Sequence, residues 1–330
     1  MSQKGGSTAV VMVALGCNFG IALAKFAAAA WTQSSAMLSE AIHSLVDTCN
    51  QVLLLIGLKR AQRPPDDCHP FGYSMEIYFW SFVVAILLFS LGSGVAIYEG
   101  VDKLLHPHPI YSPMVLYGVL GVSIVLEGIS TYNAFSEFNA RRTGSRGLIA
   151  ALRSSKDPSL FAIVLEDVAA LVGLAIALVG VMFSHLGGIE SADGIASILI
   201  GLVLGTVAVF LATEIKSLIV GEAVAAETLS GMRAIISSEM GLKKPIRLIN
   251  EIKTMHLGPE DVLVAASVDF QDRETAETVE LVTARLERAI KTRYPEVRHL
   301  FIEVQSEDAH KAEAASQAAR TKVIAGAAKV

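Results

Sequence analysis

Long apolar stretches alternate with short polar connections over the first two thirds of the chain. A helix needs about 20 apolar residues to cross the hydrocarbon core of a bilayer. Six stretches approach this length, and they lie at 8–31, 37–58, 77–101, 112–136, 159–185 and 194–219. We therefore predict a bundle of six transmembrane helices.

From about residue 221 the pattern becomes that of a soluble domain. Apolar and polar residues alternate at 248–255 and 262–270, with a shorter run at 300–304, and this period predicts three strands. Apolar residues recur at helical spacing over 227–240 and 275–294. The order αββαβ predicts a small ferredoxin-like α+β domain with its helices on one face of the sheet.

The pattern thus divides the chain into three parts. We expect a helical membrane domain at 1–220, the α+β domain at 221–307 and a tail at 308–330. The tail is rich in alanine and lysine and lacks aromatic residues, so we expect it to be a frayed helix or disordered.

Composition agrees with a membrane protein. The chain is 52% hydrophobic and 18% charged, with a mean hydropathy of +0.51, which excludes an ordinary soluble protein. Its cysteines, Cys17, Cys49 and Cys68, have no framework spacing, and we expect free thiols. No signal peptide or transit segment opens the chain, so we expect a bacterial inner (plasma) membrane rather than an organelle.

Basic residues gather on one side of the predicted helices. They are Lys4, Lys59, Arg60, Arg63, Arg141, Arg142, Arg146, Arg153, Lys156 and Lys216. The other side carries only Lys103. Because basic loops stay in the cytoplasm, both termini and the α+β domain are predicted to be cytoplasmic.

The second span contains the ionisable residues Glu40, His43 and Asp47 within MLSEAIHSLVDTCNQ. Helical spacing places them on one polar stripe with Ser39 and Asn50. Ionisable residues inside a membrane are costly and usually mark a site or a pathway. An imidazole and a carboxylate at this spacing could form half of a divalent-metal site. The alternative is a polar seam that only joins helices.

Further carboxylates lie in the fourth and fifth spans, at Glu127 and at the adjacent pair Glu166 and Asp167. At about 1.5 Å per residue, Asp47 and Asp167 both fall near the middle of a core about 30 Å thick. Two acidic helices that meet at this depth would form a site. Neighbouring residues point about 100° apart on a helix, so Glu166 and Asp167 should not both face it.

Two other features of the spans have structural interpretations. Lys25 in the first span should snorkel to an interface or meet an acidic partner in the bundle, rather than take part in transport. The sixth span has a stripe of small residues at Gly194, Ser197, Gly201 and Gly205, which favours close helix packing.

The segment RPPDDCHPFGY follows the second span. Asp66, Asp67, Cys68 and His69 are all potential metal ligands there. A solvated polar loop would have the same composition, and the spacing does not separate the two.

Together these residues resemble the cation diffusion facilitator family of divalent-metal transporters. The likeness rests on SEAIHSLVD at 39–47, on HPFGY at 69–73, and on Asp193-Gly194 with Ser197. The sequence Leu-Glu-Asp at 165–167 is similar to the branch that includes mitochondrial zinc exporters.

The resemblance implies a secondary transporter that exports zinc, or a similar divalent cation, from the cytoplasm in exchange for protons. It implies a homodimer formed through the α+β domain, with no enzymatic activity, no cofactor and no nucleic-acid partner. His43 and Asp47 would bind the cation with Asp167. His43 would carry protons, because imidazole titrates near neutral pH. Rocking of the helices around this fixed site would alternate access.

The sequence departs from the family pattern at several positions. Ile163 stands where many members have a fifth-span ligand, so Glu166 or Glu127 would complete the site. The loss of an imidazole weakens the preference for zinc over manganese, iron or cobalt. Tyr73 replaces the second histidine of the loop motif, so a loop site would rest on Asp66 or Asp67 with His69.

The α+β domain departs as well. The family's metal ligands there align with Asn250, Ser267, Glu303 and Gln305, so that regulatory site is expected to be absent or rebuilt. His256 and His299 are expected to be surface or turn residues. These losses keep a second hypothesis open, a transport-inactive subunit that regulates a partner.

Overall fold

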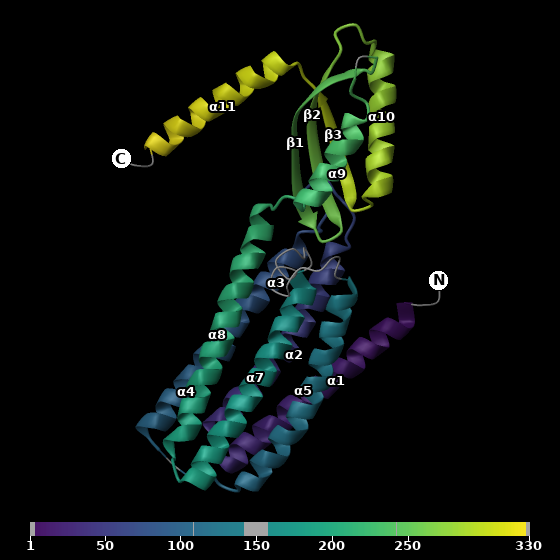
Figure 1. Cartoon of the computed structure of the whole chain (residues 1–330). Helices are drawn as coiled ribbons and strands as arrows, with labels where there is room; N and C mark the ends of the chain where they lie inside the picture. The colour runs from purple at the N-terminus through teal and green to yellow at the C-terminus, as the bar shows by residue number, and fades with distance from the viewer. Residues whose placement is uncertain (1–3, 108, 142–157, 242, 328–330) are drawn as a thin grey trace. The chain divides into compact units, whose positions relative to one another are not determined.

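A computed structural model of the chain describes residues 4–107, 109–141, 158–241 and 243–327. The chain divides into two compact units, Met1–Ile219 and Val220–Val330 (Figure 1). The basic connection that was predicted between the fourth and fifth spans, from Arg142 to Lys156, lies outside the described residues.

The regular elements of the first unit are all helices over its described residues. Its elements are α1 (Lys4–Thr32), α2 (Ser35–Ala61), α3 (Glu76–Leu87), η1 (Leu88–Ser93), α4 (Gly94–Leu105), α5 (Pro113–Arg141), α7 (Pro158–Gly187) and α8 (Ser191–Val220). Five described stretches are long and apolar enough to cross a membrane, namely α2, the continuous α3–η1–α4, α5, α7 and α8. The first predicted span corresponds to α1, a 29-residue helix.

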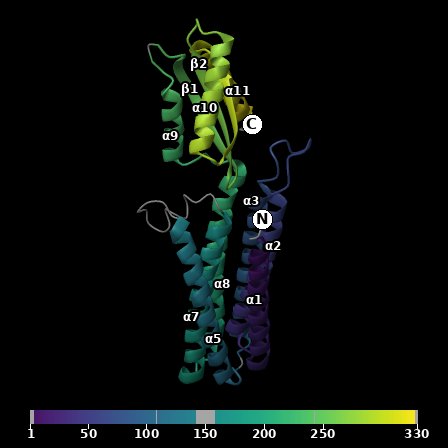
Figure 2. The ribbon, with the colours of Figure 1, turned by 90° about the vertical axis from the view of Figure 1, so that its right-hand side faces the viewer.

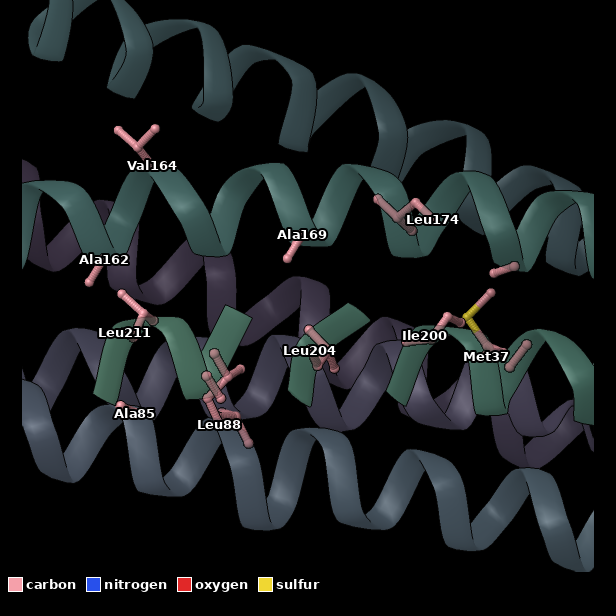
Figure 3. Close-up of a cluster of buried hydrophobic side chains, with 14 of the residues drawn as sticks. Met37, Ala85, Leu88, Ala162, Val164, Ala169, Leu174, Ile200, Leu204 and Leu211 are labelled. Carbon is pink, nitrogen blue, oxygen red and sulfur yellow. The ribbon is translucent and has the colours of Figure 1, made fainter. Parts of the chain in front are cut away.

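An apolar core joins the helices along the length of this unit. Leu88 where η1 begins, Leu174 of α7 and Leu204 of α8 are almost completely buried in it (Figure 3). The side chains that these helices turn outward are also apolar, for example Phe89, which is 53% exposed. A helix that is apolar on every side is typical of a membrane span, where lipid takes the place of water.

The predicted small-residue stripe of α8 packs against α4 and η1. A Cβ added to Gly194 would lie 2.9 Å from the Gly100 carbonyl oxygen, and one on Gly201 would lie 2.6 Å from Ile97 Cγ1. Ser197 Oγ donates to the Ala96 carbonyl at 2.7 Å. The close-packing interpretation of the stripe is therefore confirmed.

The third predicted span contains a π-helical segment, η1, that the sequence pattern did not predict. At its end Ser93 lies against α8, where a Cβ on Gly205 would meet Ser93 Oγ at 2.7 Å. A π-turn inserts a residue into the helical repeat, so it shifts which side chains face a neighbour. It lets α3 and α4 present different faces within one span.

The second unit is an α+β domain with the predicted order αββαβ. Its elements are α9 (Ala226–Ser237), β1 (Ile246–Gly258), β2 (Asp261–Phe270), α10 (Ala276–Arg293), β3 (Val297–Val304) and α11 (Glu307–Ala327). The strand order is β1-β2-β3, with β1 antiparallel and β3 parallel to β2. Helices α9 and α10 cover one face of the sheet (Figure 2) and share its apolar core, which includes Ile236, Val264 and Leu286.

Within the predicted tail, the structure has the helix α11 over Glu307–Ala327. Glu307 in its first turn forms ion pairs with Arg247 of β1 at 3.4 Å and with Lys311 at 2.6 Å. These contacts lower the pKa of the Glu307 carboxyl, the larger effect coming from Lys311.

Candidate metal site in the helical unit

A small cavity of about 20 Å³ lies among four helices of the first unit. Its lining residues are Asn18 and Ile21 of α1, Ser44, Asp47 and Gln51 of α2, Glu127 and Ser130 of α5, and Asp167 of α7. Three separate helices thus contribute one carboxylate each. The expectation that Asp47 and Asp167 share one depth agrees with this arrangement.

Asp47 and His43 lie one helical turn apart on α2. His43 Nε2 is 3.5 Å from Asp47 Oδ2, and the His43 side chain is only 1% exposed. Both His43 ring nitrogens and Asp47 Oδ1 are buried without a hydrogen-bond partner. Buried polar atoms are normally paired, so unpaired ones indicate a place for an ion, a proton or water.

The adjacent carboxylates of α7 diverge, as their spacing predicts. Asp167 Oδ2 accepts a hydrogen bond of 2.9 Å from Ser130 of α5 and lines the cavity. Glu166 is buried and accepts a 3.1 Å bond from Asn50 Nδ2 of α2. Since Glu127 lines the cavity with Asp47 and Asp167, it has the more direct access to an ion held there.

The cavity is not a finished coordination sphere. Among the residues that the structure describes, no three His, Cys, Asp or Glu side chains lie close enough to hold one ion together. Ion binding would therefore require the side chains around the cavity to move closer together.

Several lining residues were not singled out from the sequence. Ser44 and Gln51 lie three residues before and four after Asp47, so they share its face of α2. Ser130 faces Asp167 from another helix. Helical spacing from Asp47 could have identified the first two, and the same spacing from Glu127, three residues before Ser130, could have identified the third.

Lys25 of α1 meets an acidic partner inside the bundle, as one of its two interpretations predicts. Its ammonium group lies 3.3 Å from Glu40 Oε2 and donates to Ser44 Oγ at 2.8 Å. The side chains of Lys25 and Glu40 are both 0% exposed.

The loop after α2 uses Asp66 to hold its own turn. Asp66 Oδ1 accepts from the backbone amides of Cys68 at 3.0 Å and His69 at 2.7 Å, and Oδ2 accepts from the Tyr73 hydroxyl at 2.6 Å. The bond from Tyr73, followed by that from the His69 amide, lowers the pKa of Asp66 below its ordinary value. Asp66 is thus already engaged, and Asp67 is exposed. Metal binding by this loop stays a prediction, as does the role of His69 in it.

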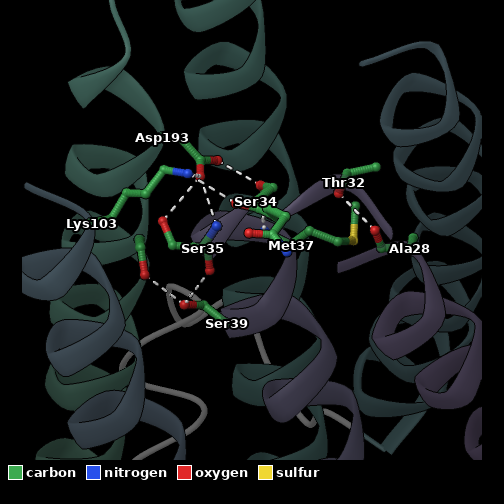
Figure 4. Close-up of polar contacts among 10 residues, drawn as sticks. Ala28, Thr32, Ser34, Ser35, Met37, Ser39, Lys103 and Asp193 are labelled. Atoms are coloured by element: carbon green, nitrogen blue, oxygen red, sulfur yellow. Dashed lines mark hydrogen bonds and ion pairs between the residues drawn. The ribbon is translucent and has the colours of Figure 1, made fainter. Parts of the chain in front are cut away.

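A second polar cluster joins α2, α4 and α8 beside the turn between α1 and α2 (Figure 4). Asp193 accepts hydrogen bonds from Ser34 Oγ at 2.6 Å and from the Ser35 amide at 2.7 Å. Lys103 Nζ lies 4.0 Å from Asp193 Oδ2 and donates to the Gln33 carbonyl at 2.9 Å. Lys103, which the sequence placed among connecting residues, is a buried residue of α4.

The α+β domain brings together the four positions that align with family ligands. Asn250, Ser267, Glu303 and Gln305 line a groove of about 710 Å³. Asn250 Nδ2 donates to Ser267 Oγ at 3.2 Å and to the Gln305 carbonyl at 2.8 Å. Neutral groups therefore bond to one another at Asn250, Ser267 and Gln305, and Glu303 is the one carboxylate among the four positions.

Two histidines in the strands of this domain lie beside the β1–β2 turn. His256 in β1 is 6% exposed, and its Nδ1 lies 3.3 Å from the carbonyl of Gly258 at the β1–β2 turn. His299 in β3 is 25% exposed and lies 3.6 Å from Asp261 at the same turn. Both rings therefore lie beside residues of the β1–β2 turn, and His256 is buried whereas His299 is partly exposed.

Comparisons with known proteins agree with this architecture. The profile described as "Cation efflux transmembrane domain" matches residues 11–220. The human protein named "Proton-coupled zinc antiporter SLC30A9, mitochondrial" is 32% identical over 338 residues, which cover 91% of this chain and 59% of that protein. Metal tolerance protein C4 of Arabidopsis thaliana is 32% identical over 286 residues, 86% of this chain and 61% of that protein.

The alignment with a third relative covers most of both chains. The manganese efflux system protein MneS of Bacillus subtilis is 22% identical over 287 residues, 86% of this chain and 91% of that protein. The first two relatives are longer, and this chain spans about three fifths of their length. The match over 11–220 covers more than half of the chain. The chain is a multi-pass membrane protein and belongs to the cation efflux, or cation diffusion facilitator, family.

Proposed function

We propose that this chain is a secondary transporter that exports a divalent cation, zinc first of all, from the cytoplasm in exchange for protons. The observation that carries the proposal is the cavity that Asp47, Glu127 and Asp167 line from three different helices. Carboxylates are expensive inside a membrane unless they serve a cation pathway. The names of two relatives, a zinc antiporter and a metal tolerance protein, support the same function.

In this mechanism the cation is the cargo, and the protein only binds and releases it. Asp47, Asp167 and His43 are the proposed ligands, and Glu127 completes the set more directly than Glu166, which is engaged by Asn50. Carboxylates and imidazole bind metal in their deprotonated forms, so binding releases protons and protonation releases metal. This competition couples the two flows in opposite directions.

Manganese is the second candidate cargo. Three carboxylates and two serine hydroxyls around one cavity give an oxygen-rich environment, and oxygen ligands suit manganese better than zinc. A relative named for manganese efflux supports this alternative. His43 beside Asp47 is the group that favours zinc.

The proposal includes the surroundings of the protein. The helical unit would lie in a bilayer, which we propose is a bacterial inner membrane, with both termini and the α+β domain in the cytoplasm. A homodimer through the α+β domain is the proposed assembly. No nucleic acid, enzymatic reaction or resident cofactor is part of the proposed activity.

The test is metal uptake into sealed proteoliposomes under an imposed pH gradient. Zinc, manganese, iron and cobalt would compete for the wild-type chain, with Asp47→Asn and Asp167→Asn measured in parallel. Asp102→Asn is the matched control, because Asp102 is an exposed residue of α4 that pairs with His106 and does not line the cavity. We expect gradient-driven zinc uptake by wild type and control, and its loss in both cavity variants.

Each alternative has its own result. Preferred uptake of manganese would keep the site and change the cargo. Full uptake by Asp47→Asn would refute the site. If wild type moved no metal alone but did so with a partner chain, the regulatory-subunit hypothesis would replace this one.

A further inference from the structure

The ion pair of Lys25 and Glu40 forms part of the wall beside the candidate metal site. Asn18 and Ile21 of α1 line the cavity, and Lys25 lies four residues after Ile21. Residues at this spacing share one face of a helix. Lys25 contacts two residues of α2, Glu40 and Ser44, and Ser44 also lines the cavity. The Lys25 ammonium group therefore contacts both its ion-pair partner, Glu40, and a residue of the cavity wall, Ser44.

Glu40 has one engaged and one free carboxylate oxygen. Lys25 pairs with Oε2, whereas Oε1 is buried without a hydrogen-bond partner. Oε1 points at α7, because a Cβ added to Gly173 would collide with it. Glu40 precedes His43 by three residues, so the free oxygen lies on the same side of α2 as the proposed ligands. Without Lys25, Glu40 would offer the cation a further negative ligand.

A role of Lys25 in stability alone explains this arrangement less well than a role in transport does. Buried ion pairs contribute little net stability compared with well-packed neutral residues, and membranes add to the cost of each charge. Lys103 shows what a structural lysine looks like in this bundle, since it binds the Gln33 carbonyl and Asp193 away from the cavity. Lys25 instead contacts a residue of the cavity wall.

We infer that Lys25 is the counter-ion that sets the charge of the transport site. Its ammonium group neutralises Glu40, keeps this carboxylate from binding the cargo, and so limits the negative charge that the cation meets. A site with too much negative charge would hold the cation and release it slowly. Lys25 is thus a positioning residue for transport, and the inference rests on the proposed function.

The experiment measures zinc binding to the full chain in lipid nanodiscs at a fixed neutral pH. The variants are Lys25→Met, Glu40→Gln and the double Lys25→Met/Glu40→Gln. We expect Lys25→Met to lower the Kd for zinc about tenfold, Glu40→Gln to raise it about tenfold, and the double variant to return near wild type. Removal of groups that surround metal ligands changes metal affinity by this order. In proteoliposomes, Lys25→Met should lower both KM and the maximal rate.

The matched control is Lys103→Met, which removes another buried lysine of the helical unit. It should lower the unfolding temperature without changing the Kd of the folded protein. If Lys25→Met does not fold, Lys25→Arg should keep the wild-type Kd, and the comparison of Glu40→Gln with the double variant carries the test. The double variant is neutral at both positions and should fold.

If Lys25 is a counter-ion, the two single variants should shift the Kd in opposite directions and the shifts should cancel in the double variant. A change of Kd in the same direction in both single variants, or changes below twofold in both, would overturn the inference while wild-type flux still supported the transport function. Zinc binding without flux in wild type would refute the transport function, and the Kd pattern would still decide the role of Lys25. Absence of binding in wild type would overturn both.

Discussion

At the scale of single residues, the site depends on Ser130 as well as on its proposed ligands, because Ser130 orients one of them. Ser130 of α5 donates a 2.9 Å hydrogen bond to Asp167 Oδ2 of α7. This bond fixes the orientation of a proposed ligand and joins two helices at the cavity. Groups that orient metal ligands usually change affinity by about 10–100-fold when they are removed.

Ser130→Ala should therefore weaken cation binding without abolishing transport. We expect KM for zinc uptake to rise about tenfold, because Asp167 loses the bond that holds it toward the cavity. The maximal rate should change less, since the ligands themselves remain. Zinc concentration series in proteoliposomes would measure both quantities.

Ser136→Ala is the control for Ser130→Ala, because Ser136 is an exposed serine of the same helix that does not line the cavity. It should leave KM unchanged. Equal KM values for Ser130→Ala and wild type would show that the bond to Asp167 does not support binding.

The sequence predicted the charged part of the site better than its neutral part. Asp47 and Asp167 were found because a carboxylate in an apolar helix is costly and their depths match. Ser130 was not, since a serine is cheap to place in a membrane helix and its partner lies on another element. The choice between Glu127 and Glu166 also needed the rotation of α7 about its axis, which spacing alone leaves open.

At the scale of elements, glycines allow α4 and α8 to pack closely. A Cβ on Gly100 would lie 2.7 Å from the Gly194 carbonyl oxygen and 2.6 Å from Ile198 Cγ1. Atoms at these distances clash, and one of them belongs to the backbone, which cannot rotate away. Gly118 of α5 offers a contrast, because a Cβ there would meet nothing within 4 Å.

Gly100→Ala should destabilise the helical unit, while Gly118→Ala should not. Overpacking costs about 1–3 kcal/mol, whereas alanine gains up to about 1 kcal/mol over glycine in an open helix position. Thermal unfolding of the two variants in detergent micelles would compare them directly. Equal unfolding temperatures would contradict the tight contact between α4 and α8.

The elements themselves were largely predictable, with physical reasons for the exceptions. Long apolar runs and the αββαβ order gave the helices and the sheet, because both depend on local periodicity. The π-helical segment η1 was missed, since composition does not predict it, and its last residue, Ser93, packs against Gly201 and Gly205 of α8. His256 was expected at the surface or in a turn, and it is a buried residue of β1 whose ring lies beside the Gly258 carbonyl of the β1–β2 turn.

At the scale of the whole molecule, the orientation in the membrane follows from where charges are accessible. Lys103 is buried in α4, so it adds no exposed charge to the connection between α4 and α5. On the opposite side, Lys59, Arg60 and Arg63 flank the end of α2 and are exposed. This asymmetry is larger than the sequence alone suggested, and it favours a cytoplasmic loop between α2 and α3.

Cys68 in this loop provides a direct test, because it is a free and exposed thiol. From the loop to the end of α8 the chain crosses the membrane four times, through α3–η1–α4, α5, α7 and α8, so both points should lie on the same side. With Cys17 and Cys49 replaced by serine, a membrane-impermeant maleimide should label Cys68 only after the cells are permeabilised.

A Tyr111→Cys variant that also lacks Cys68 should be labelled in intact cells, since Tyr111 is 56% exposed in the connection between α4 and α5. The reverse pattern would place the loop outside the cell. The direction of exchange would stay the same, because the proton gradient drives an antiporter in either orientation. The cytoplasmic placement proposed for the loop and for the end of α8 would then be refuted.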